Sequence, residues 1–221
     1  MAESGADGSF AAPRAGPAAA GDLYRRLLEG GSGDPFDRHV FACALVIAAS
    51  EAERPLTQAL GLSASDLQAL MQRYLTTAAA ELALAVPAET DAGNDTIEEP
   101  DLRRLLLDNR TDRDDPAGRW LAMIVARRSG RPNHLWQDLG LFSRDELSLL
   151  MRRQFMPLAA RNRGDMKWKK FFYRTLCAED GIVVCKAPNC ETCSDVDLCF
   201  GGEPGEPLAL FQSALLQSRQ K

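Results

Sequence analysis

Apolar residues recur every three or four positions along most of the chain, the spacing of one face of an α-helix. Local signals mark where helices begin and end. Asp34 is an expected helix cap, Pro35 suits a first helical turn, and Gly30 ends the preceding helix. Helices are therefore predicted over residues 22–29, 35–54, 101–110, 119–128 and 165–177. Apart from residues 182–184, nothing predicts a strand, so we expect an all-α fold.

Two stretches of the chain resemble each other. Leu60-Gly61-Leu62 recurs as Leu139-Gly140-Leu141, and both copies follow an apolar helix closed by Arg-Pro. With one residue inserted, Leu67, Leu70, Met71 and Arg73 match Leu147, Leu150, Met151 and Arg153. This similarity predicts a duplicated helix–turn–helix unit over about 36–75 and 119–155. Two such units packed together form a helical bundle.

Composition divides the rest of the chain. The Ala-, Gly- and Pro-rich start is expected to be disordered, and the acidic stretch 87–100 to be a flexible loop. We predict a disordered tail at 1–20, a helical body at 21–164, an aromatic-basic helix with a cysteine-rich loop at 165–203, and a C-terminal tail at 204–221.

Charge and hydropathy restrict the class of protein. The chain has 221 residues, 45% of them hydrophobic, and a net charge of −5, which argues against nucleic-acid binding. Its longest apolar run, residues 40–49, is half of the roughly 20 residues that a membrane span needs. Since the N-terminus also lacks an apolar signal region, we expect a cytoplasmic protein without membrane contact.

The predicted helix 165–177 separates apolar from basic side chains. Asp165 is its expected cap, and Gly181 its expected stop. Its apolar face, expected to pack on the body, contains Trp168, Phe171, Phe172 and Leu176. Eight basic residues lie between 152 and 174. Four of them are candidates to contact an oxyanion or an acidic partner: Lys167, Lys169, Lys170 and Arg174.

Four cysteines follow within fifteen residues, in the pattern C-x4-C-x2-C-x5-C: Cys185, Cys190, Cys193 and Cys199. In a reducing compartment, clustered cysteines more often bind metal than form disulfides. Structural zinc sites usually have two short cysteine pairs, whereas C-x4-C-x2-C begins the plant-type iron–sulfur spacing. The spacing favours an iron–sulfur cluster and leaves a structural zinc site as the alternative.

Four further residues have side chains that could bind a metal. Cys177 lies four residues past Tyr173, off the apolar face of its helix, and is a candidate fifth thiol. His134 can supply a nitrogen ligand, although a role in capping or packing is favoured. His39 and Cys43 also have chelating spacing, but Cys43 lies among apolar residues and is interpreted as a core side chain.

The stretch MKWKKFFYRTLC…GIVVCKAPNCETCSDVDLCFG (166–201), preceded by HLWQDLGLFSRDEL (134–147), resembles the NifQ family. The similarity is strong over about 120–201, weaker over the first repeat, and the cysteine motif shows no departure. It implies a non-enzymatic iron–sulfur protein that carries molybdenum, obtained as molybdate. Its partners would be the proteins that assemble the iron–molybdenum cofactor of nitrogenase. By position, Cys185, Cys190, Cys193 and Cys199 would bind the cluster.

Overall fold

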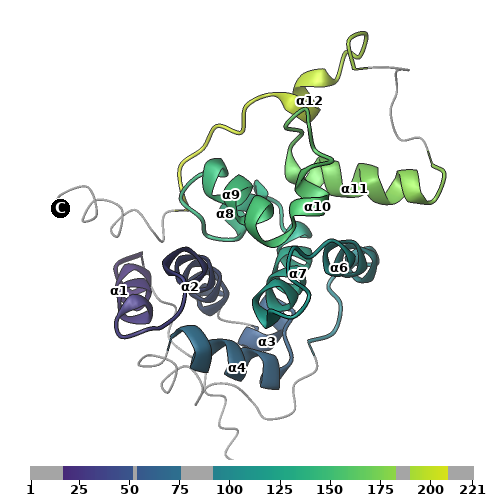
Figure 1. Cartoon of the computed structure of the whole chain (residues 1–221). Helices are drawn as coiled ribbons and strands as arrows, with labels where there is room; N and C mark the ends of the chain where they lie inside the picture. The colour runs from purple at the N-terminus through teal and green to yellow at the C-terminus, as the bar shows by residue number, and fades with distance from the viewer. Residues whose placement is uncertain (1–16, 52–53, 76–91, 183–189, 209–221) are drawn as a thin grey trace, which may run out of the picture.

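The computed structural model describes residues 17–51, 54–75, 92–182 and 190–208, and within these ranges all regular structure is helical (Figure 1). The all-α prediction is confirmed. In these ranges, no helix is long and apolar enough to cross a lipid bilayer. Ile182 is exposed and lies in no strand, whereas residues 183 and 184 lie outside the described ranges.

The first helix begins earlier than predicted. α1 covers Pro17–Leu28, so residues 17–20 are helical instead of belonging to the tail. Pro17 suits a first helical turn and the three alanines that follow favour helix, which explains the earlier start. Residues 1–16 of the predicted tail lie outside the described residues.

The two predicted units have matching helices. The first contains α2 (Pro35–Ser50), α3 (Leu56–Leu60) and α4 (Ala64–Tyr74), and the second contains α7 (Pro116–Ser129), α8 (Leu135–Asp138) and α9 (Arg144–Gln154). Gly61 and Gly140 both have left-handed backbone angles, φ 70° and 74°. In each unit this glycine lets the chain reverse before the third helix, which a serine caps.

The units exchange contacts through equivalent positions. In the first unit, Asp66 on α4 accepts a hydrogen bond from Trp120 Nε1 of the second, at 3.2 Å. In the second unit, Glu146 on α9 lies 3.2 Å from His39 Nε2 of the first. Both carboxylates stand three residues after the capping serine, and both rings stand five residues after the capping aspartate of α2 or α7. The repeat therefore packs as a pseudo-symmetric pair.

A second exchange involves these aspartate caps. Arg73 at the end of α4 pairs with Asp115, the cap of α7, at 2.8 Å. Its counterpart Arg153 on α9 pairs with Asp34, the cap of α2, at 2.9 Å. The last turn of each unit thus contains an arginine that forms an ion pair with the capping aspartate of the other unit.

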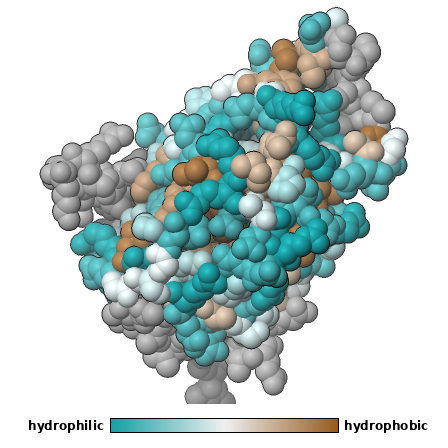
Figure 2. Space-filling model, viewed as in Figure 1, coloured by the Kyte–Doolittle hydropathy of each residue, from teal (hydrophilic) through white to brown (hydrophobic). Residues whose placement is uncertain are grey.

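The core lies between the two units. Every residue from Val40 to Ala48 on α2 is buried, and Cys43 is completely enclosed, which confirms its interpretation as a core residue. The leucines and methionines that match between the repeats are buried as well. Figure 2 shows that the outer surface over these helices is mainly hydrophilic.

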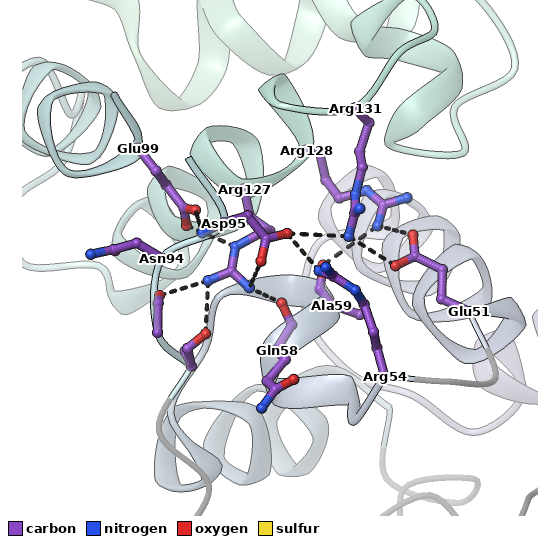
Figure 3. Close-up of polar contacts among 12 residues, drawn as sticks. Glu51, Arg54, Gln58, Ala59, Asn94, Asp95, Glu99, Arg127, Arg128 and Arg131 are labelled. Atoms are coloured by element: carbon purple, nitrogen blue, oxygen red, sulfur yellow. Dashed lines mark hydrogen bonds and ion pairs between the residues drawn. The ribbon is translucent and has the colours of Figure 1, made fainter. Parts of the chain in front are cut away.

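Residues 92–100 are fixed to the body. Arg127 on α7 is fully buried and donates to Glu99 Oε1 at 2.8 Å, to the carbonyl oxygen of Gly93 at 2.7 Å and to that of Ala92 at 2.9 Å (Figure 3). A flexible loop is therefore the wrong description of these residues, whereas residues 87–91 lie outside the described ranges. Because Glu99 is drawn in, α6 (Glu99–Asp108) begins two residues before its predicted start.

Further ion pairs extend this network to the end of α2. Arg128 donates to Glu51 at 2.5 Å, and Arg131 contacts both Glu51 and Asp95 (Figure 3). Arg54 pairs with Asp95 at 2.6 Å. Burial lowers the pKa of Arg128, but the carboxylate of Glu51 opposes this effect. The network fastens α2, α7 and the segment before α6 to one another.

Candidate metal centre

The helix that leads to the cysteines is α11 (Trp168–Glu179), which runs along the body at the end of the molecule opposite α3 and α4 (Figure 1). Trp168, Phe171 and Phe172 are buried with their rings in mutual contact, and Leu176 is buried on the same face. This confirms the predicted packing face. The helix ends just before Gly181, as predicted, where φ is 72°.

The predicted cap of this helix is wrong. The capping position is Lys167, without a side-chain hydrogen bond, and Asp165 has a left-handed backbone with φ 52°. The reason is Asn162, whose side chain bonds both the N–H and the carbonyl of Met166 at 2.9 Å and closes a turn there. Asp165 points instead to Arg144, at 3.0 Å. Met166 is consequently a buried residue of this turn and is not part of the helix.

The basic residues of α11 have different surroundings. Lys169 Nζ lies 2.6 Å from Asp138 Oδ2 and 2.7 Å from the carbonyl oxygen of Asn133, and it also contacts the carbonyl of Arg131. Burial lowers the pKa of Lys169, opposed by the hydrogen bond to Asp138. Its three donors are thus occupied by the body. Lys170 and Arg174 are exposed on the outer side of the helix.

Lys167 connects the start of α11 to the cysteine segment. Its backbone N–H donates to the carbonyl oxygen of Cys199 at 2.8 Å, and its ammonium lies 3.2 Å from the carbonyl oxygen of Asp197. Both contacts fall on α12 (Val196–Phe200), the short helix that contains the last cysteine of the motif. Sequence reasoning placed Lys167 among oxyanion contacts, and the structure additionally gives it this local role.

Three of the four motif cysteines lie in the described residues. Cys190 is exposed, Cys193 and Cys199 are half-buried, and Cys185 lies outside the described ranges. Cys193 N–H bonds the carbonyl of Cys190 at 3.3 Å, and a second turn follows into α12. Within the described parts of the chain, no three His, Cys, Asp or Glu side chains form a group that can hold a metal ion.

α12, which contains Cys199, is poorly covered by the rest of the protein. α12 has no buried residue, and Leu198 is 58% exposed. Figure 2 accordingly shows apolar atoms at the surface over α12. Phe200 packs on Gly164, where an added Cβ would lie 3.1 Å from its ring, closer than ordinary van der Waals contact. The thiols are thus presented on a short, accessible element that is attached at its base.

The two additional candidate ligands near the cysteines are differently placed. Cys177 is half-buried near the end of α11, ten residues after Lys167, which is about 15 Å along a helix. The structure therefore does not place it beside Cys199. His134 caps α8, and its Nδ1 lies 3.1 Å from Glu203 Oε1.

The His39 and Cys43 pair lies elsewhere, between α1, α2 and α9. Tyr24 Oη lies 2.7 Å from His39 Nδ1, and Cys43 Sγ lies 3.6 Å from the same atom. Burial raises the pKa of Cys43 well above its usual range and also raises that of Tyr24. Both groups are held neutral, which suits a packing role.

Sequence reasoning missed Glu203 and Arg144. Glu203 is 6% exposed in its side chain, and its Oε2 lies 3.3 Å from Arg144 Nε. In the sequence, Glu203 lies among glycines and prolines and looks like part of a polar C-terminal segment. The only sequence signal was its position shortly after the last cysteine, since the partners are about sixty and seventy residues away.

Comparison with known proteins gives one family. A family model described as NifQ matches residues 40–201, a range that includes all four motif cysteines. The chain is similar to the Protein NifQ homolog of Sinorhizobium fredii, 41% identical over 175 residues, which are 77% of this chain and 74% of that protein.

Two other similar proteins belong to the same family. Protein NifQ of Azotobacter vinelandii is 50% identical over 103 residues, 47% of this chain and 52% of that protein. Protein NifQ of Rhodobacter capsulatus is 41% identical over 146 residues, 66% of this chain and 78% of that protein. No solved structure matches the chain.

Proposed function

Because the chain belongs to the NifQ family, we propose that it carries molybdenum on an iron–sulfur cluster. It donates this metal to the proteins that assemble the iron–molybdenum cofactor of nitrogenase. The coarser part, a role in nitrogen fixation that involves molybdenum processing, follows from family membership. The loaded cluster is the cargo of a carrier, and no catalytic turnover is proposed. We place the protein in the cytoplasm, where thiols stay reduced.

The observation that supports this proposal most directly is the exposure of the motif thiols. Cys190, Cys193 and Cys199 lie at or near the surface of one short segment. Soft thiolates are suitable ligands for iron–sulfur clusters, and a cargo that is handed on requires an accessible site. In the proposal these three residues and Cys185 bind the cluster, which supplies the sulfide-rich surroundings that retain molybdenum.

The approach of molybdate is assigned to the exposed basic side of α11. Lys170 and Arg174 face solvent, and Lys167 lies beside α12, so these three side chains attract a dianion or an acidic partner. Lys169 is excluded from this role in the proposal because its donors are already bound to the body. It serves instead to fix α11.

A structural zinc site is the second candidate, because thiolates also suit zinc. Anaerobic purification followed by metal and sulfide analysis separates the two. If the protein is a molybdenum carrier, the purified protein should be brown, absorb broadly in the visible range and contain iron, acid-labile sulfide and molybdenum. A colourless protein with one zinc per chain would overturn the carrier proposal.

A further inference from the structure

The chain that leaves Cys199 is fixed along the helical body. We call residues 199–208 the strap. At its start, the carbonyl oxygen of Cys199 accepts the N–H of Lys167 at 2.8 Å. Near its end, Gln137 Nε2 donates to the carbonyl oxygen of Glu206 at 2.9 Å, and Pro207 is buried. The strap therefore follows the surface of α8 after it leaves the cysteine segment.

Glu203 is the central contact of the strap. Its neighbours Gly202 and Pro204 are exposed, yet its own carboxylate is almost completely buried. His134 Nδ1 lies 3.1 Å from Oε1, and Arg144 Nε lies 3.3 Å from Oε2. A carboxylate enters such surroundings only when partners compensate for the lost hydration, so burial and pairing depend on each other here.

The two partners of Glu203 are themselves fixed in the body. His134 is the capping residue of α8, and its N–H bonds the side chain of Gln137 at 3.3 Å. Arg144 is the first residue of α9, and it also donates to the carbonyl oxygen of Asp165 at 2.8 Å, in the turn before α11. One carboxylate thus connects the strap to the second repeat unit and to the turn that leads into α11.

We propose that Glu203 is a positioning residue for the cysteine segment. By binding His134 and Arg144 it fixes the outgoing chain four residues after Cys199, and so holds this thiol in place against the body. Lys167 at the start of α11 separately holds the carbonyl oxygen of Cys199. This inference rests on the proposed function, in which Cys199 is one of the cluster ligands.

The test uses Glu203→Gln, which keeps the shape of the side chain and removes its charge. Glu206→Gln is the matched control, since Glu206 lies in the same strap with its side chain exposed. The first measurement is the alkylation rate of each thiol in reduced, metal-free full-length protein, followed by peptide mass spectrometry. Glu203→Gln is expected to raise the alkylation rate at Cys199 about tenfold, because His134 and Arg144 lose a buried charged partner. The rate at Cys43 stays unchanged in both variants.

The second measurement is made on anaerobically loaded protein. Glu203→Gln is expected to change the electron paramagnetic resonance spectrum of the bound cluster and to lower its iron content, whereas Glu206→Gln matches the wild type. Glu203→Asp, which keeps the charge, restores part of the Cys199 protection.

Each adverse result has a distinct meaning. Equal Cys199 rates in Glu203→Gln and Glu206→Gln overturn the positioning role, whatever the metal content. Faster alkylation of Cys43 as well shows that Glu203 stabilises the whole fold, which also overturns it. A wild-type protein without iron overturns the proposed function, while the alkylation rates still decide the role of Glu203.

Discussion

In the helical body, several charged side chains are buried and paired, whereas in residues 190–200 the side chains are exposed or half-buried. Arg127 and Glu99 have almost no contact with solvent, yet each has several partners. Cys190 is exposed and α12 has no buried residue. The body is thus held by contacts among its own buried side chains, while the described attachments of the cysteine segment lie at α12 and at Glu203 beyond it. The side chains of this segment are therefore accessible to a ligand or a partner.

The largest expected effect separates these two regions. Replacing Cys190 or Cys193 with Ala should reduce iron and molybdenum in anaerobically purified protein to background, because in the proposed function each supplies a thiolate ligand. Helical circular dichroism and the melting temperature of the metal-free protein should stay unchanged, since neither residue is in the core. Cys43→Ser is the control, because it affects the core and spares the motif. In protein purified with its metal, a loss of helical signal in Cys193→Ala relative to wild type would instead indicate a structural metal site.

Replacing the buried Arg127 should have the opposite effect, a loss of stability in the helical body. Arg127→Met removes one of the two arginines that pair with the buried Glu99 and should lower the free energy of unfolding by about 3 kcal/mol. Chemical denaturation of the metal-free protein measures this change. Arg104→Met on α6 is the control, because Arg104 is largely exposed beside Asp101 and should change stability by less than about 0.5 kcal/mol. Similar losses in both variants would contradict the structural role of Arg127.

Much of the body follows from local signals in the sequence. Asp34 before Pro35 and the glycines at 61 and 140 set helix ends through interactions within a few residues, and the structure has helices beginning or ending there. The repeated Leu-Gly-Leu segments identified the two units for the same reason. Local signals failed at Asp165, because the side chain of Asn162 closes a different turn three residues earlier.

Long-range partners were beyond sequence reasoning. The burial of Arg127 depends on Glu99 and on carbonyls more than thirty residues away, and nothing next to Arg127 in the sequence indicates this. Glu203 is a similar case, since His134 and Arg144 come from other elements. The cysteine motif is recognisable in the sequence because its four cysteines lie within fifteen residues, and their role as ligands stays a prediction. The different fates of Lys169 and Lys170 were not, because they depend on which side of α11 meets the body.

The pseudo-symmetry of the body predicts matching losses in the two units. Asp34→Ala removes hydrogen bonds to the N–H groups of Phe36 and Asp37, and Asp115→Ala removes the one to Ala117. Each should cost about 1–2 kcal/mol of unfolding free energy, mainly through the lost cap. Denaturant titrations of the two single variants measure these losses.

A double-mutant cycle that compares wild type, Asp34→Ala, Arg153→Ala and the double variant isolates the exchanged ion pair, which is expected to contribute less than about 1 kcal/mol at this exposed site. A strongly unequal pair of losses at Asp34 and Asp115 would contradict the equivalence of the units.

The last expected effect concerns Glu146 and depends on pH. Burial raises the pKa of Glu146, but the hydrogen bond to His39 and the backbone N–H groups of Phe142 and Ser143 outweigh it, so the folded pKa lies below the usual 4.5. A depressed carboxyl pKa adds stability that is complete above the unfolded pKa and is lost as the pH falls through the folded pKa. Glu146→Gln should therefore be less stable than wild type near pH 7, by about 1 kcal/mol. This difference should shrink as the pH falls below about 4.5. Unfolding titrations at pH 7, 5 and 3.5 measure it, and a difference that grows on acidification would mean that Glu146 is destabilising in its ionised form.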